Sequence, residues 1–191
     1  MGQAPPKHYS GLDPELVGLR AYSHPAVRAY WRWLLEEYKP SSSIALVTPC
    51  SNVKPYTRSP TSRKIKGMLR RLGLWDESSN RPKGIEWLYF SDLLALVPYW
   101  RAEEYPACCY ELPPTMLRDG YRNLLVSIVS RVVARLCERG LRTIVTFLPR
   151  MHRELWSAAR SSSSLWPMEV QVKYTIFSLR ELESTLRRLI A

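Results

Sequence analysis

Residues 44–59 read IALVTPCSNVKPYTRS, an apolar run that passes directly into a polar loop. The run from Ile44 to Thr48 is short and rich in aliphatic residues, which is typical of a strand buried on both faces. The loop after it carries a thiol at Cys50 and a cation at Lys54. In open α/β sheets, ligands bind beyond the carboxyl ends of the strands. This loop is therefore the first candidate for a functional site.

Strands and amphipathic helices alternate through the rest of the chain. This order predicts an α/β fold with right-handed crossovers and a mainly parallel sheet of about four strands, covered on both faces. We expect the strands at residues 44–48, 85–90, 142–148 and 170–177. We expect helices near residue 13 and at 23–38, 62–72, 116 or 120 to 139, 152–160, and from 178 onward. Four prolines interrupt residues 91–115, which we expect to form a long irregular loop.

The chain of 191 residues is long enough for one substantial core, so we expect a single domain over residues 1–191. Residues 1–40 are expected to add a helical layer to an α/β core at 41–191. The first ten residues are polar and lack the pattern of a secretory signal. No apolar run approaches the roughly 18 residues of a membrane span. These patterns predict a cytoplasmic protein that does not cross a membrane.

The chain carries 28 Lys and Arg residues against 17 Asp and Glu residues, a net charge of +11. An excess of this size favours a polyanionic partner, most simply a nucleic acid. An arginine-rich proteome would explain the same excess without any such partner. Charge alone therefore indicates a class of partner and leaves the substrate open.

A basic segment follows the Cys50 loop. No acidic residue lies between Cys50 and Trp75, so a bound phosphate backbone is one source of the missing counter-charge. Tyr56 and nearby aromatic residues could stack a base that has left its helix. The alternative is a solvated basic face above ordinary core aromatic residues. The candidates for nucleic-acid contact are Arg58, Arg63, Lys64, Lys66, Arg70 and Arg71.

The four cysteines, Cys50, Cys108, Cys109 and Cys137, show no CxxC spacing. This spacing predicts no metal site. Cys108 and Cys109 are adjacent, which is poor geometry for a mutual bond, and we expect no disulfide in a reducing cytosol. Cys50 differs from the others because Lys54 and Arg58 follow it, and nearby cations favour the nucleophilic thiolate. The alternative is that Cys50 packs as a small apolar residue.

Two motifs carry a resemblance to a known family. The first is PC-x3-KPY-x2-S at residues 49–59, and the second combines residues 91–98 with YPACCYELP at 105–113. Together they resemble the catalytic domain of archaeosine synthase, an archaeal relative of the tRNA-guanine transglycosylases, over roughly residues 40–180. The chain departs from the family pattern at Ser62, where the family has a histidine, and at Glu111, where it has an aspartate.

The resemblance implies a three-layer α/β/α sandwich similar to the uracil-DNA glycosylases. It also implies a stand-alone, divergent archaeosine-synthase-type domain that acts on 7-cyano-7-deazaguanine in tRNA and adds an amine, from lysine, to the nitrile. No redox cofactor or catalytic metal is implied. The implied partner is tRNA, with a separate RNA-binding or transglycosylase-related protein as a possible second partner in trans.

A nitrile carbon is electrophilic, so a Cys50 thiolate could form a covalent thioimidate that an amine then resolves. The predicted catalytic residues are Cys50, Lys54 and Asp92. The predicted substrate-binding residues are Tyr56, Ser59, Tyr105, Tyr110, Glu111 and His152, and we expect Asp92, Glu111 and His152 to gather at one edge of the sheet. Two alternatives remain: a tRNA-binding module of the same fold without catalysis, and a nucleobase glycosylase, which rests on fold similarity alone.

Overall fold

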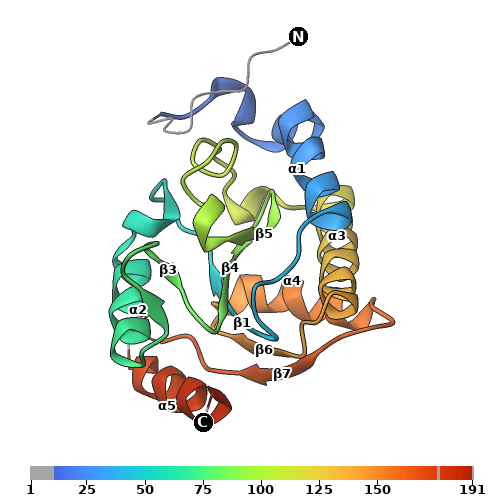
Figure 1. Cartoon of the computed structure of the whole chain (residues 1–191). Coiled ribbons are helices and arrows are strands. Elements are labelled where there is room, and N and C mark those ends of the chain that lie inside the picture. Colours follow the sequence, from blue (N-terminus) through green and yellow to red (C-terminus); the bar gives the residue numbers. More distant parts are fainter. Residues whose placement is uncertain (1–10, 176, 191) are drawn as a thin grey trace.

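A sheet of five strands, in the order β5-β4-β1-β6-β7, runs through the middle of the molecule (Figure 1). The structure is a computed structural model that describes residues 11–175 and 177–190. The strands are β1 (Ile44–Pro49), β4 (Glu86–Ser91), β5 (Ala95–Pro98), β6 (Thr143–Thr146) and β7 (Met168–Gln171). All neighbours pair in parallel except β4 and β5, which are antiparallel.

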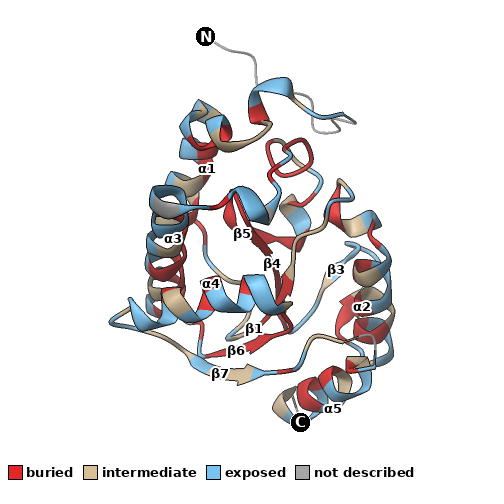
Figure 2. Ribbon diagram, turned by 180° about the vertical axis from the view of Figure 1, so that it is seen from behind, coloured by how far each residue is buried: buried red, intermediate tan, exposed pale blue. Residues whose placement is uncertain are grey.

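The central strands are buried because helices cover both faces of the sheet. Every residue of β4 and β6 is buried, while the edge strand β7 is half-exposed (Figure 2). Parallel strands covered on both sides read as continuous apolar runs, which is why the run after Ile44 predicts β1. The expected α/β fold with a mainly parallel sheet is confirmed.

Five α-helices lie within the described residues, and they form two layers. Helices α2 and α5 lie on one face of the sheet, and α1, α3 and α4 lie on the other (Figure 1). The helices are α1 (Pro25–Glu36), α2 (Pro60–Arg71), α3 (Asp119–Glu138), α4 (Arg150–Ser161) and α5 (Leu179–Ile190). None of these described helices is long and apolar enough to cross a bilayer.

Short elements complete the described fold. A small antiparallel hairpin joins β2 (Trp75–Asp76) to β3 (Arg81–Pro82). The 3-10 helices are Pro14–Leu16, Leu19–Ser23, Tyr56–Arg58, Tyr99–Arg101 and Pro114–Met116. The helix expected near residue 13 is the first of these, capped by the Asp13 side chain. The polar N-terminus at residues 1–10, and with it part of the expected layer at 1–40, lies outside the described residues.

Strand β5 was not expected, and it brings the sheet to five strands where about four were predicted. The Ser91 hydroxyl accepts hydrogen bonds from the backbone N–H groups of Leu93 and Leu94. These bonds tighten the chain after β4, and Ala95 completes the turn with a φ of 66°. The chain then runs back antiparallel to β4 as strand β5. This strand lies within residues 91–115, which the prolines predicted to be irregular.

The fourth expected strand, at 170–177, is also placed differently. Strand β7 begins and ends earlier, at Met168 and Gln171, and residue 176 lies outside the described part of the chain. Parallel pairing with β6 sets these limits, because Thr143 aligns with Met168 and Thr146 with Gln171. The short length of β6 therefore determines the length of its neighbour.

Cys108 and Cys109 form a disulfide, so the expectation of no disulfide is wrong. Two local backbone hydrogen bonds, from Cys108 to Glu104 and from Cys109 to Pro106, fold this part of the chain into consecutive turns. The turns bring the adjacent side chains together, which the sequence spacing did not reveal. Cys50 and Cys137 are free thiols.

One arginine joins the N-terminal layer to the core. The guanidinium of Arg139, just after α3, donates to the carbonyl oxygens of Leu34, Leu35 and Tyr38 at 3.2, 2.6 and 2.7 Å. These carbonyls lie at and just beyond the C-terminal end of α1. Helix C-termini leave such carbonyls unpaired and carry partial negative charge, so Arg139 satisfies both needs at once.

Arg139→Ala should lower the free energy of unfolding by about 1–3 kcal/mol, because hydrogen bonds to a charged group are lost from partly buried carbonyls. Urea unfolding measures this change. Arg135→Ala is the matched control, since the one partner of the Arg135 side chain among the described residues is Glu138, in an exposed pair on the same helix, and such pairs contribute about 0–1 kcal/mol. Equal losses in both variants would contradict the capping role of Arg139.

Candidate functional site

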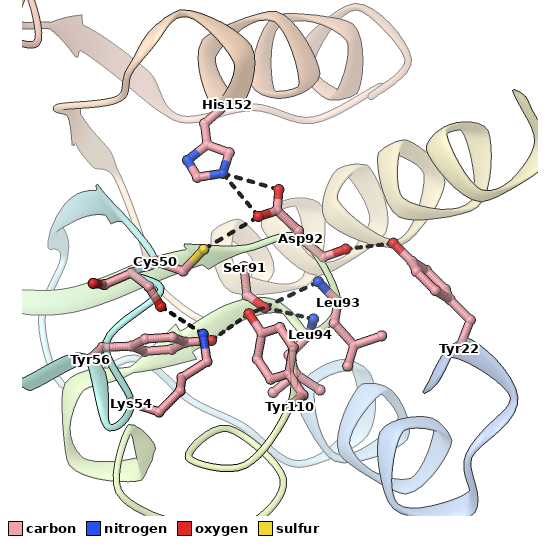
Figure 3. Close-up of polar contacts among 11 residues, drawn as sticks. Tyr22, Cys50, Lys54, Tyr56, Ser91, Asp92, Leu93, Leu94, Tyr110 and His152 are labelled. Carbon is pink, nitrogen blue, oxygen red and sulfur yellow. Dashed lines mark hydrogen bonds and ion pairs between the residues drawn. The ribbon is translucent and has the colours of Figure 1, made fainter. Parts of the chain in front are cut away.

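Three strand ends meet at one point of the sheet. Cys50 follows β1, Asp92 follows β4, and His152 lies in the first turn of α4, which comes after β6 (Figure 3). Helix α2 leaves β1 on one face and α4 leaves β6 on the other. In α/β sheets, this divergence of neighbouring connections opens a crevice at the carboxyl ends of the strands. The fold therefore places these three side chains where ligands bind.

The three side chains form one hydrogen-bonded group. The Cys50 Sγ atom lies 3.4 Å from Oδ2 of Asp92, and Nε2 of His152 lies 3.0 Å from Oδ1 and 3.2 Å from Oδ2. Asp92 and His152 are buried, while Cys50 is half-buried. The Tyr22 hydroxyl donates to the backbone carbonyl of Asp92 at 2.5 Å. A thiol, a carboxylate and an imidazole are thus held together with the thiol nearest to solvent.

The electrostatics of this group favour a charged imidazole. Burial by itself lowers the pKa of His152, but the hydrogen bonds and negative charges of Asp92 and Cys50 outweigh it and raise the pKa from 6.5 to about 10. The ring packs against Phe90, with 5.2 Å between ring centroids. Its Nδ1 atom is buried and has no hydrogen-bond partner among the described residues. His152 can therefore carry a proton beside the thiol at neutral pH.

Lys54 enters the same site from the loop after β1. Its Nζ atom donates to the Ser51 carbonyl at 2.7 Å and lies 4.5 and 4.2 Å from the ring centroids of Tyr56 and Tyr110. Burial lowers the pKa of Lys54, and the negative charges of Cys50, Asp92 and Glu111 oppose that shift. Aromatic faces attract a cation, so the two rings hold the ammonium group in place.

A chain of hydroxyl groups positions the two rings. The Tyr56 hydroxyl donates to the Tyr110 hydroxyl at 2.5 Å, and the latter lies 2.7 Å from Oγ of Ser91 (Figure 3). Burial raises the pKa of both phenols, so both stay neutral. Tyr56 has no exposed surface. In this structure the Tyr56 ring is therefore covered, and it lies against Lys54.

A cavity of about 570 Å³ opens above these residues. Its volume falls in the range of about 300–1,000 Å³ that is typical of small-molecule sites. The predicted residues that line it are Cys50, Lys54, Arg58, Asp92, Tyr110 and Glu111. The lining also includes Gly11, Leu12, Asn52, Pro55, Glu103, Cys108, Leu112 and Pro113. All three predicted catalytic residues thus line one cavity, whereas His152 contacts Asp92 and is not itself among the lining residues.

Two predicted substrate-binding residues have other roles. The Ser59 side chain caps α2 by accepting from the Ser62 backbone N–H at 3.1 Å, and Ser59 does not line the cavity. The Tyr105 hydroxyl donates to Oδ2 of Asp13 at 2.8 Å, which ties the N-terminal segment to the loop after β5. Ser62 is buried and receives a hydrogen bond from the Tyr89 hydroxyl. These positions serve the scaffold of the site.

Sequence reasoning missed several residues that build the site. Ser91 lies inside a quoted motif beside Asp92, but no pattern showed that its hydroxyl would hold both a turn and Tyr110. Gly11 and Leu12 reach the cavity because backbone hydrogen bonds join Asp13 to Cys109 at 2.8 Å and Gly18 to Glu111 at 2.8 Å. Such contacts between distant segments leave no periodic signal in the sequence.

Several basic side chains of the segment after Cys50 have partners that the sequence did not predict. Arg70 makes a bidentate contact with Glu77 at 2.6 Å, Arg71 pairs with Glu183 at 2.8 Å, and Lys66 donates to Asn80 at 2.6 Å. These partners lie beyond the stretch that lacks acidic residues. Within the described part of the chain, Arg58, Arg63 and Lys64 are exposed and have no side-chain partner. The open cationic surface therefore lies at the start of α2, beside the cavity.

Cys50, Asp92 and His152 also form a possible metal donor set, with ligand atoms within 4.8 Å of one another. Thiolate, imidazole and carboxylate groups are ligands of zinc. A metal-binding histidine nearly always donates its other ring N–H to a partner, whereas Nδ1 of His152 has none among the described residues. The Lys54 ammonium group also opposes a second cation beside Cys50. The donor set therefore fits a hydrogen-bonded thiol, carboxylate and imidazole better than a metal.

The raised pKa of His152 predicts a pH-dependent stability. A group whose folded pKa lies above its unfolded value of 6.5 stabilises the fold fully below pH 6.5, and this stabilisation is lost as the pH rises through about 10. His152→Gln should therefore lower the free energy of unfolding by a few kcal/mol at pH 6, and the difference from the original protein should shrink toward pH 10. Urea unfolding across this range measures it. A constant difference would contradict the charged imidazole.

Comparisons with known proteins agree with the motifs. The model of a domain of unknown function, DUF5591, matches residues 27–186. The archaeosine synthase subunit alpha of Thermoplasma acidophilum is 26% identical over 168 residues, which is 87% of this chain and 30% of the relative's length. The crystal structure of AF0587, a protein of unknown function, has a TM-score of 0.58 at 17% identity and covers 84% of this chain and 49% of that chain, a likeness of fold alone. Because the family model matches most of its length, this chain belongs to the DUF5591 family.

Proposed function

We propose that this chain is a tRNA-modifying transferase that adds an amine to the nitrile of a 7-cyano-7-deazaguanine base. The observation that carries this proposal is the hydrogen-bonded group in which Asp92 contacts both Cys50 and His152, with Cys50 and Asp92 lining a cavity together with Lys54. The distant similarity to an archaeosine synthase subunit supports the choice of substrate. The transfer needs no redox cofactor, since no electrons are gained or lost.

The first step is attack by the Cys50 sulfur on the nitrile carbon. The Cys50 thiol donates to Asp92, which gives its proton a path away from the sulfur. The new S–C bond converts the nitrile into a thioimidate, whose nitrogen takes a proton from the His152 imidazolium. The half-buried Lys54 ammonium stabilises negative charge on the sulfur before attack and on the nitrogen during it.

The second step releases the enzyme. The incoming amine attacks the thioimidate carbon and forms a tetrahedral intermediate, and the now neutral His152 takes the proton that the amine loses. The S–C bond then breaks, which leaves an amidine on the base, and the released Cys50 thiolate takes its proton back from Asp92. The resemblance to archaeosine synthase suggests lysine as the amine. Atoms and charges balance without any further reactant.

His152 offers the imidazole that the family motif places elsewhere. Position 62 is a serine here, and its hydroxyl is buried against Ser59 and Tyr89. His152 comes from α4, on the opposite face of the sheet from α2, and contacts Asp92 beside the Cys50 thiol. The departure at Ser62 therefore removes one imidazole from the motif while another imidazole is available at the thiol.

The second candidate is a tRNA-binding module that has lost catalysis. The observation in its favour is the exposed cationic start of α2, which binding alone would explain. In that case the arrangement of Cys50, Asp92 and Lys54 would have no chemical role. The two functions differ in their dependence on Cys50, because only the transferase needs a nucleophile.

Cys50→Ala should abolish amine incorporation into tRNA that carries the nitrile base, because the covalent step is lost. We expect a rate loss of at least about 100-fold. Mass spectrometry of digested tRNA measures incorporation. When the amine is omitted, the original protein should also accumulate a covalent adduct at Cys50, visible by mass spectrometry of the intact protein.

The free thiol Cys137 supplies the matched control. Cys137 is buried on α3 and does not line the cavity, so Cys137→Ala should retain both incorporation and adduct formation. Binding of tRNA should be the same in both variants. Unchanged amine incorporation by Cys50→Ala would reject the covalent mechanism. If the original protein binds tRNA but incorporates no amine, and both variants bind tRNA equally well, the binding module is favoured.

Replacing Arg58, Arg63 and Lys64 together by alanine should weaken tRNA binding and flatten its salt dependence. Each lost phosphate contact should reduce the slope of log affinity against log salt by about 1. Filter binding at several salt concentrations measures the slope. Arg70→Ala is the control, since Glu77 already neutralises Arg70. Equal effects in the triple variant and in Arg70→Ala would contradict an interface at the start of α2.

A further inference from the structure

We propose that a second, smaller cavity binds the base next to the modified one by stacking it on Trp100. This proposal rests on the proposed function, because it concerns the RNA strand that would carry the modified base. The cavity has a volume of about 220 Å³ and is lined by Thr57, Ser79, Asn80, Arg81, Tyr99, Trp100, Glu103 and Glu104. It is smaller than the range of about 300–1,000 Å³ for drug-sized ligands, which suits a single base.

The two cavities share a wall. Glu103 lines both of them, and the Thr57 hydroxyl donates to Oε1 of Glu103 at 2.5 Å. Thr57 lies in the loop that also carries Lys54 and Arg58, both of which line the larger cavity. A strand that places one base beside Cys50 would therefore pass this wall and bring a neighbouring base to the second cavity.

Trp100 is held as a rigid platform. It lies in the 3-10 helix after β5, where Tyr99 stacks on Trp87 with 4.8 Å between ring centroids. Trp33 meets the Trp100 ring edge-on at 5.8 Å, and Arg101, paired with Glu104 at 2.8 Å, lies 5.7 Å from the same ring. Trp100 nevertheless keeps 36% of its surface exposed. An exposed indole held on several sides is suited to stacking a base at little entropic cost.

Arg81 marks the place of the base. Its guanidinium lies 5.5 Å from the Trp100 ring centroid, and Arg81 makes no ion pair among the described residues. Arginine stacks on bases as it does on aromatic rings. A base would therefore take the Trp100 face over which Arg81 now lies, and the displaced guanidinium would stack on the base.

The polar groups of the second cavity favour a base over a phosphate. The carboxylate of Glu103 repels a phosphate but accepts hydrogen bonds from the amino groups of bases. Asn80 accepts from Lys66 through its Oδ1 atom and Ser79 donates its hydroxyl to Asp76, so the groups they add are the Asn80 amide N–H groups and the lone pairs of the Ser79 oxygen. The phosphate contacts are expected instead at the start of α2, outside this cavity.

The test is a double-mutant cycle between the protein and the RNA. The probe is an RNA hairpin with 7-cyano-7-deazaguanosine, prepared intact or with an abasic residue on the 5′ or the 3′ side of the modified base. Trp100→Ala should weaken binding of the intact probe by about 5- to 150-fold. The same substitution should have little effect on one of the two abasic probes, because that probe lacks the stacked base. Trp100→Phe should restore most of the affinity.

Phe177→Ala is the matched control, since Phe177 is an exposed aromatic residue that lines neither cavity. It should bind all three probes as the original protein does. Equal weakening of all three probes by Trp100→Ala, or no weakening, would overturn the stacking site. If the original protein modifies the intact probe in that case, the proposed function stands without the subsite. If the original protein binds none of the probes, both proposals fail.

Discussion

The Asp92 carboxylate is the group on which the rest of the site depends. It is almost wholly buried, and a buried charge is costly unless it is paired and hydrogen-bonded. Asp92 meets this requirement by contacting His152 and Cys50 at once. Three chain segments must therefore come together for the fold to tolerate one carboxylate. A variant that removes one partner leaves the other charge without compensation, which links the stability of the sheet edge to its chemistry.

The tip of the β4–β5 hairpin positions this carboxylate. Ser91 closes the turn through the N–H groups of Leu93 and Leu94, and the same hydroxyl lies beside Tyr110. The turn thus sets the direction of Asp92 while the tyrosine pair holds Lys54 nearby. The turn at Ser91 therefore helps to position both the Asp92 carboxylate and the Lys54 ammonium group in one cavity. Preorganised charges of this kind are what a transferase needs to stabilise a developing charge.

Some basic side chains of the segment after Cys50 form pairs within the fold, and others are exposed without a partner among the described residues. Lys66, Arg70 and Arg71 are occupied by partners from the β2–β3 hairpin and from α5. The residues at the start of α2 remain open, and they lie next to the cavity rather than along the whole helix. The net charge of the chain therefore overstates the size of the proposed RNA-binding surface. The basic side chains that lack a partner among the described residues indicate where that surface lies.

The sequence by itself determined the class of fold, because apolar periodicity and capping residues act between near neighbours. The aliphatic run at Ile44–Thr48 predicted β1, and the strand end predicted where Cys50 would lie. Only the tertiary structure decided which residues complete the site. Cys50 and His152 approach Asp92 across 42 and 60 positions in the chain, and the turn at Ser91, the pairing of Arg70 with Glu77 and the burial of Tyr56 also depend on packing between segments. The physical reason is that local patterns record the partners a residue needs, such as apolar cover or a counter-charge, whereas the identity of a distant partner is set when the layers pack together.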